Sequence, residues 1–161
     1  MRIGIVSETH GHLGYTRKAV EALAENRVER VFHCGDIGSS EIVPLFAPWP
    51  THFVFGNCDH DHSELHQTIE LWEQTSHGLF GSVELEGTSV ALTHGHVPQL
   101  LRDAISSQKH RLVCYGHTHL REHHYEGETL VLNPGALFRA NPHTIAIVDL
   151  PELMVTSIEI L

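Results

Sequence analysis

The sequence has little of what defines several large protein classes. Only three of its 161 residues are cysteines, none in a Cys-x-x-Cys pair, which argues against a disulfide framework or a cysteine-rich zinc site. No apolar run approaches the roughly 20 residues that cross a bilayer, so we expect no membrane span. Ten basic residues stand against twenty acidic ones, giving a formal net charge of −10. This charge argues against an extended basic surface for nucleic acid or an anionic membrane.

The remaining composition is typical of a globular protein. Hydrophobic residues make up 41% of the chain and charged residues 19%, with a mean hydropathy of −0.11, which is too apolar for a disordered chain. The length fits a single domain over residues 1–161. The first six residues lack the apolar stretch of a secretory signal, so we expect a cytoplasmic protein. Its unusual feature is a content of sixteen histidines.

The order of the predicted elements indicates an α/β fold. Within the first 56 residues, strand-like runs at 3–6, 31–32 and 52–55 alternate with helix-like stretches at 14–26 and 40–47, which favours parallel strands. The second half predicts more antiparallel pairing around turn residues. Its expected helices cover 63–75 and a segment from Pro98, and its strands cover 83–86, 89–93, 112–115, 120–125, 129–132, 144–149 and 153–160. We therefore predict two sheets packed on one another with helices outside.

Polar clusters follow the predicted strands. In chain order they are Glu8-Thr9-His10, Gly35-Asp36, Gly56-Asn57-Cys58-Asp59, Thr93-His94-Gly95-His96, Gly116-His117-Thr118-His119 and Asn133-Pro134-Gly135-Ala136. Sites in open α/β sheets form outside the carboxyl ends of the strands, so these distant segments can converge there. Two residues separated by one on an extended segment point to the same side, which suits Glu8 with His10 and His117 with His119.

Each of these residues also has an ordinary explanation when taken alone. An Asp after a Gly is usually a turn or a helix cap, a buried His is usually a hydrogen-bonded core residue, and Asn57 would suit an Asx turn. Their joint occurrence at successive strand ends instead predicts a metal site. Mixed nitrogen and oxygen ligands favour Mn, Ni, Fe, Zn or Co over Ca and Mg. Because seven ligands exceed the needs of one ion, we expect two divalent ions per chain.

With these motifs the chain resembles the calcineurin-like metallophosphoesterase superfamily, and within it the small YfcE-like phosphodiesterases. That family shows D-x-H, G-D, G-N-x-D, T-H-G-H, G-H-T-H and N-P-G in this order, and the motifs here run from Glu8 to Gly135. The resemblance implies a four-layer αββα sandwich of two mixed sheets flanked by helices. The implied ligands of the first ion are Glu8, His10, Asp36 and His119, and those of the second are Asp36, Asn57, His94 and His117.

The chain departs from the family pattern at two positions. Glu8 stands where the family has Asp. Because Glu is one methylene longer, we expect the first ion to bind less tightly than the second, and Glu8→Asp to tighten it. Cys58 stands where many larger relatives carry a His thought to protonate the leaving group, which leaves the general acid open. The residues nearest to the site that could support the ligands or supply this acid are His12, Cys58, His60 and His96.

The resemblance also implies a reaction. Two ions would clamp the oxygens of a small phosphate ester, most readily a diester, and a bridging metal-bound hydroxide would attack phosphorus in line. Among the ligands, Asp36, Asn57 and His94 would carry catalysis. Five cations follow the motifs closely enough to contact a substrate, and the sequence does not choose among them. They are Arg17, Lys18, Arg102, Arg121 and Arg139.

Two other functions compete with catalysis. The family also resembles the retromer subunit that keeps the sandwich, has lost metal ligands and works as an interaction scaffold; Glu8 is the feature that favours this alternative. A histidine-rich metal-storage or sensing protein would instead cluster its histidines rather than distribute them over five strand ends. The sequence leaves open the physiological substrate, the native metal and the oligomeric state, a homo-oligomer included.

Overall fold

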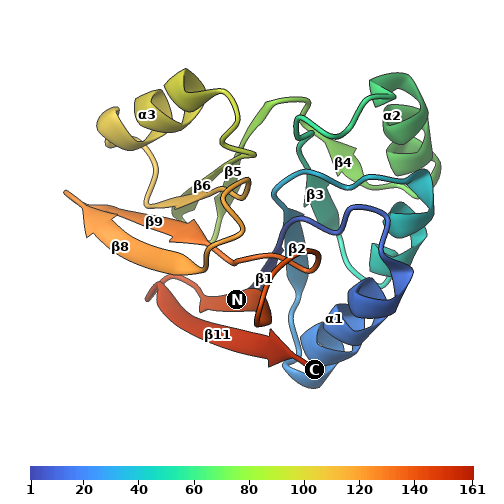
Figure 1. The fold of residues 1–161 in the computed structure, drawn as a ribbon. Coiled ribbons are helices and arrows are strands. Elements are labelled where there is room, and N and C mark those ends of the chain that lie inside the picture. Colours follow the sequence, from blue (N-terminus) through green and yellow to red (C-terminus); the bar gives the residue numbers. More distant parts are fainter.

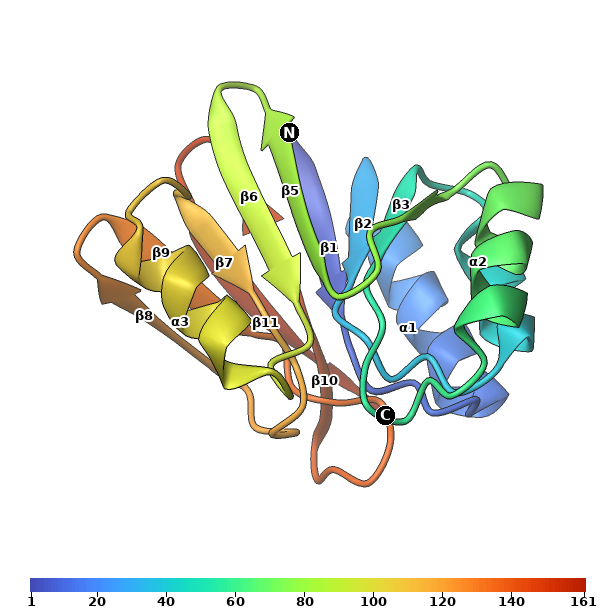
Figure 2. The same ribbon diagram turned by 90° about the horizontal axis from the view of Figure 1, so that it is seen from above.

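Two β-sheets lie face to face with helices on both outer sides in the computed structural model, which describes residues 1–161 (Figures 1 and 2). The first sheet has the strand order β11-β10-β1-β2-β3-β4, and the second has the order β5-β6-β7-β9-β8. In the first sheet the strands are β1 (Arg2–Val6), β2 (Arg30–His33), β3 (Thr51–Phe53), β4 (Thr75–Ser76), β10 (His143–Asp149) and β11 (Met154–Ile160). In the second they are β5 (Phe80–Leu85), β6 (Thr88–Thr93), β7 (Leu112–Cys114), β8 (Glu122–Glu126) and β9 (Thr129–Asn133).

The helices complete the four layers. Helices α1 (Leu13–Glu25) and α2 (His62–Leu71) and the 3-10 helix η1 (Ser40–Phe46) cover the first sheet, while α3 (Pro98–Ser106) covers the second (Figure 2). Both sheets mix parallel and antiparallel pairs. The αββα sandwich of two mixed sheets is therefore confirmed. No helix of the structure combines the length and the hydrophobicity needed to span a membrane.

The predicted elements are all present, with bounds that differ by up to three residues in most of them, and the largest departure lies around residue 73. The helix expected over 63–75 ends at Leu71, and Glu73 takes a positive φ of 54° that terminates it. Thr75–Ser76 then forms β4, which pairs in parallel with β3. A two-residue strand carries no alternation of apolar and polar residues, so sequence periodicity has no means of finding it.

The hydrophobic core has two main parts because the central strands are buried on both faces. On β1, Ile3 and Ile5 point toward the second sheet, whereas Val6 faces the helices. The layer between the sheets is completed by residues such as Phe32, Val54, Val90, Leu92, Leu112, Cys114, Leu130 and Leu132. This alternation fixes the register of each strand, since a slip of one residue would turn its apolar side chains to the wrong face.

The carboxyl ends of six strands meet at one edge of the sandwich. Strands β1, β2 and β3 are parallel neighbours in the first sheet, and β6, β7 and β9 are parallel neighbours in the second. Backbone hydrogen bonds join the loops that follow them: Gly116 donates to His94 over 3.0 Å, and Leu137 donates to Ser7 over 3.3 Å. The polar clusters of the sequence are therefore brought to a common place.

Candidate metal centre

The loop after β1 carries a fully buried carboxylate, that of Glu8. Its Oε2 lies 3.0 Å from Nε2 of both His10 and His119. Its Oε1 accepts hydrogen bonds from the backbone N–H of His117 over 2.5 Å and from the Ser7 hydroxyl over 3.1 Å. Glu8 therefore ties the loop after β1 to the loop after β7, and leaves one oxygen facing two imidazoles.

Asp36 lies in the loop after β2, between the imidazoles of His10 and His94. Its Oδ2 is 3.5 Å from His10 Nε2 and 3.4 Å from His94 Nε2, and its Oδ1 accepts the backbone N–H of Cys58 over 2.8 Å. Burial alone would raise the pKa of Asp36, but the hydrogen bonds with His94 and the Cys58 amide, together with the charges of His94 and His10, hold this pKa below its ordinary value. Asp36 is therefore a carboxylate at neutral pH.

Two imidazoles are oriented through their second ring nitrogen. His94 Nδ1 lies 2.8 Å from the carbonyl oxygen of Cys34, and His119 Nδ1 lies 3.3 Å from that of Arg139. A carbonyl only accepts, so each Nδ1 carries a hydrogen, and Nε2 is the ring nitrogen that faces the carboxylates and is available to a metal. The Nε2 of His94 is also 3.1 Å from Oδ1 of Asn57. Metal-binding histidines typically donate their other N–H in this way.

The seven predicted ligands therefore lie together, with the His117 ring centroid 5.1 Å from that of His94. Three groups bring their ligand atoms within 4.8 Å of one another: Glu8 with His10 and His119, Glu8 with Asp36 and His94, and His10 with Asp36 and Cys58. The ion-pair partners of Glu8 and Asp36 are all histidines. Two buried carboxylates without a lysine or arginine partner are costly unless a cation neutralises them. The donor set thus fits divalent metal ions.

The backbone is strained where these side chains are presented. Among eleven non-glycine residues with positive φ, five belong to the predicted ligands: Glu8, His10, Asp36, His117 and His119. Five others, Arg27, Glu73, Glu86, Gln108 and Leu153, lie just after helices or in hairpin turns. The eleventh is Arg139, with a φ of 49°. Such conformations cost of order 1–3 kcal/mol each and concentrate at functional sites.

Sequence reasoning assigned no role to two residues that hold the loops in place. His33 on β2 accepts the Gly35 N–H at Nδ1 over 3.3 Å, so its Nε2 carries the hydrogen and donates to Thr9 Oγ1 over 3.0 Å. Asp59 accepts the backbone N–H groups of Gly38 and Gly56, each over 2.8 Å. The last position of the G-N-x-D motif signals Asp59, whereas nothing in the sequence distinguishes His33 from a core histidine.

Of the residues expected to support the ligands or to supply an acid, His12 and His60 lie outside the ligand cluster. His12 Nδ1 accepts the Tyr15 N–H over 3.2 Å and so caps α1. His60 is exposed on the rim of a hollow that it shares with Cys58. No hydrogen bond or ion pair joins either side chain to the carboxylate of Glu8 or Asp36.

Cys58 and His96 lie closer to the ligands. Burial raises the pKa of the Cys58 thiol, so it stays protonated at neutral pH beside His10 and Asp36. The His96 ring centroid is 5.3 Å from that of His94, and burial lowers its pKa, so this imidazole is neutral. Its Nδ1 is buried without a hydrogen-bond partner. Both groups thus adjoin the centre in their uncharged forms.

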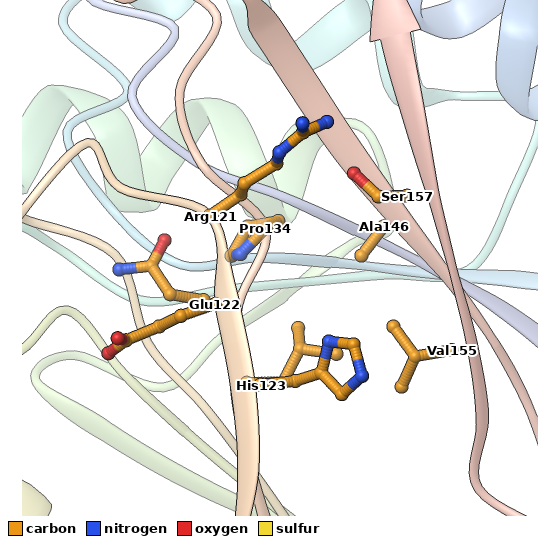
Figure 3. A pocket seen from close by; sticks show the side chains of 9 residues that line it. Arg121, Glu122, His123, Pro134, Ala146, Val155 and Ser157 are labelled. Atoms are coloured by element: carbon orange, nitrogen blue, oxygen red, sulfur yellow. The ribbon is translucent and has the colours of Figure 1, made fainter.

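A separate hollow of about 250 Å³ lies at the edge of the sandwich and includes none of the seven predicted ligands. In Figure 3 the His123 ring from β8 and Val155 from β11 face each other across it, with Arg121 at its upper end. Leu132 and Ala146 add apolar lining. The hollow thus lies between edge strand β8 of the second sheet and edge strand β11 of the first, away from the candidate metal centre.

Comparison with known proteins agrees with this geometry. Residues 1–152 match the calcineurin-like phosphoesterase superfamily domain. The phosphodiesterase MJ0936 of Methanocaldococcus jannaschii is 37% identical over 138 residues, which cover 84% of this chain and 83% of that protein. The phosphodiesterase YfcE of Escherichia coli is 30% identical over 157 residues, which cover 85% of this chain and 79% of that protein.

Solved structures extend the likeness to the whole fold. An archaeal phosphodiesterase superposes with a TM-score of 0.91 at 34% identity, covering 99% of both chains. Vps29 of Chaetomium thermophilum superposes with a TM-score of 0.74 at 13% identity, covering 99% of this chain and 95% of that one. At this identity the second likeness is one of fold alone.

Proposed function

The chain belongs to the calcineurin-like phosphoesterase superfamily, and from this premise we propose that it is a phosphodiesterase that works with two divalent metal ions. The observation that carries the proposal is the meeting of two buried carboxylates, four imidazoles and one amide at the carboxyl ends of the strands. The name of phosphodiesterase that both curated relatives bear supports a diester as the substrate.

Asp36 is the proposed bridge between the two ions. Its Oδ2 faces both His10 and His94, which fall in different halves of the ligand set. In this assignment the first ion is held by Glu8, His10, Asp36 and His119, and the second by Asp36, Asn57, His94 and His117. The backbone carbonyls bonded to His94 and His119 fix the rings before any ion arrives.

The chemistry that the ions would supply is Lewis-acid clamping of the ester oxygens and a lowered pKa of bound water. Phosphoryl transfer otherwise depends mainly on positioning and charge neutralisation, and these are what the side chains provide. Glu8 and Asp36 contribute −2 against +4 from two divalent ions, which leaves +2 to attract a phosphate anion. The overall charge of −10 opposes this only weakly, because salt screens exposed charges beyond about 8 Å.

Metal removal and replacement test the proposal. The purified protein would be chelated, checked for residual metal by mass spectrometry, and then supplied with Mn²⁺, Ni²⁺ or Co²⁺. We expect two ions per chain, and hydrolysis of bis(p-nitrophenyl) phosphate in preference to p-nitrophenyl phosphate only after metal is restored. Undiminished activity in verified metal-free protein would contradict the mechanism.

The same assay separates the two rival functions. A non-catalytic scaffold is consistent with the Vps29 fold, and it would hydrolyse neither ester with any metal. A metal-storage protein would bind more than two ions of similar affinity without hydrolysis. The intact ligand set favours catalysis over both, since a scaffold has no need to bury two carboxylates among four imidazoles.

A further inference from the structure

A hollow of about 480 Å³ opens beside the candidate metal centre. Its lining includes the predicted ligand His119 together with Arg121 and Arg139, and it contains no acidic side chain. We call it the Arg139 pocket. Ligand sites of small molecules typically occupy about 300–1,000 Å³, so this pocket has room for an anionic group together with part of the molecule that carries it.

Arg139 is the uncommitted cation of this pocket. Arg121 is paired with Glu159 over 3.2 Å, whereas Arg139 forms no ion pair and its guanidinium donates no hydrogen bond within the protein. The Arg139 guanidinium lies 5.2 Å from the ring centroid of Phe138, which itself lies 5.4 Å from that of His10. The cation is thus seated on a ring that packs against a predicted ligand, with its hydrogen-bond donors free.

The backbone gives a second, independent reason to assign a function to Arg139. It is the one non-glycine residue with positive φ that is neither a predicted ligand nor placed after a helix or in a hairpin turn. Its carbonyl oxygen accepts from His119 Nδ1 over 3.3 Å, which couples its position to that of the ligand. Arg139 therefore shares the strained, positive-φ backbone conformation of the predicted ligands.

The other cations near the motifs are placed less favourably. Arg17 and Lys18 on α1 and Arg102 on α3 do not line the Arg139 pocket, and Arg102 already donates to Gln99 over 3.0 Å. Arg121 shares the pocket, but its charge is compensated by Glu159. Arg139 is therefore the cation that the geometry selects.

We propose that the Arg139 pocket binds a second phosphate group of the substrate, so that the preferred substrates are phosphodiesters that also carry a phosphomonoester. This inference rests on the proposed function, in which the metal centre holds the scissile phosphate. A guanidinium binds phosphate oxygens through two parallel N–H donors. A dianionic phosphomonoester therefore binds it more strongly than a neutral group does.

A binding experiment tests the pocket without requiring turnover. Metal-loaded protein would be titrated by calorimetry with adenosine 5′-monophosphate and with the 2′,5′- and 3′,5′-bisphosphates of adenosine. We expect at least one bisphosphate to bind about 10-fold more tightly than the monophosphate. Arg139→Gln should abolish this preference, and Arg102→Gln, a matched exposed arginine outside the pocket, should keep it.

Two results would overturn the proposal: equal affinities for mono- and bisphosphates in the wild type, or a preference that survives Arg139→Gln. A parallel assay would compare kcat/KM for the dinucleotide ApA with that for its 5′- and 3′-phosphorylated forms, where the phosphorylated substrates should be favoured only with Arg139 present. If the binding preference is found but no diester is hydrolysed, the proposed function fails while the pocket assignment stands.

Discussion

Glu8 shows how one side chain can hold a loop in place and still present an oxygen to a proposed metal ion. One of its oxygens accepts the His117 N–H, while the other faces His10 and His119. The extra methylene relative to Asp lets the carboxylate span these two tasks from the end of β1. From the sequence alone the longer side chain suggests a weakened first site, but its contacts indicate a local adaptation.

We therefore expect Glu8→Asp to weaken the first metal site, in contrast to what the sequence suggests. We expect the shorter carboxylate to lose either the His117 N–H or the imidazoles, and the loss of such a supporting contact typically costs about 10-fold or more in metal affinity. Calorimetric metal titration of wild type, Glu8→Asp and Glu8→Gln, which keeps the length but not the charge, measures this. Tighter binding by Glu8→Asp would show that the His117 contact is dispensable.

Asp36 should be the least replaceable ligand. Asp36→Asn removes the negative charge between the two proposed ions, and a metal displaced by about 1 Å can lower the rate on the order of 100-fold. His119→Gln should lose less activity, because His119 is partly exposed and belongs to one proposed ion only. Steady-state kinetics with metal counted by mass spectrometry compares the two variants. Retention of both ions and of activity in Asp36→Asn would refute the bridging role.

At the scale of elements, parallel pairing continues beyond β1 and β2 into the loops that carry ligands. His10 and Gly11 donate to the carbonyls of Asp36 and Ile37 over 2.9 and 2.8 Å. Between them, Thr9 Oγ1 accepts from His33 and donates to Ile37 over 3.0 Å. Two loops are thus locked together below the site, which keeps the ligands in place despite their strained backbone.

Thr9→Val tests this lock because it keeps the shape of the side chain but removes the hydroxyl. The fully buried His33 N–H would lose its acceptor, which we expect to cost about 1–3 kcal/mol of the free energy of unfolding. Thr9→Ser keeps the hydroxyl and should be less destabilised. Urea unfolding midpoints of the two variants decide the matter, and equal midpoints would mean that the hydroxyl is not needed.

At the scale of the whole molecule, His52 links the packing of the sandwich to pH. It is buried on β3, where its ring stacks on Phe32 at 4.9 Å between centroids. Arg30 can only donate, so its contact of 2.9 Å makes His52 Nε2 an acceptor, and Nδ1–H donates to His77 over 2.9 Å. Burial, with the added charges of His77 and Arg30, lowers the pKa of His52 to about 4.

Because this pKa is lower in the folded than in the unfolded chain, the unfolded chain binds more protons between about pH 6.5 and pH 4. The stability that His52 contributes is therefore present above pH 6.5 and is lost as the pH falls, by at most about 1.4 kcal/mol per pH unit. The free energy of unfolding, measured with urea at pH 6.5 and at pH 4.5, should fall less between these two pH values in His52→Gln than in the wild type. His124→Gln, an exposed control, should show the same fall as the wild type. An identical fall in the free energy of unfolding in all three proteins would refute the role of His52.

The predictable and unpredictable parts of the site differ in physical origin. Glu8, His10, Asp36, Asn57, His94, His117 and His119 were recognisable because each stands at a strand end in a spaced motif. Phe138 and Arg139 stand in no such motif, and their position near the predicted ligands follows from a loop that returns beside His119. The lock between Thr9 and His33 joins positions 24 residues apart, which no local pattern encodes.

The order of alternating and amphipathic apolar segments was enough to predict the layered α/β fold, because it leaves few ways to bury both faces of two sheets. The sequence also determined which residues are available as ligands. The contact of Glu8 with the His117 loop, the absence of an ion pair at Arg139 and the burial of His52 against Arg30 emerge only from the three-dimensional packing. These outcomes depend on distances between segments far apart in the chain, and such distances exist only after the two sheets have packed.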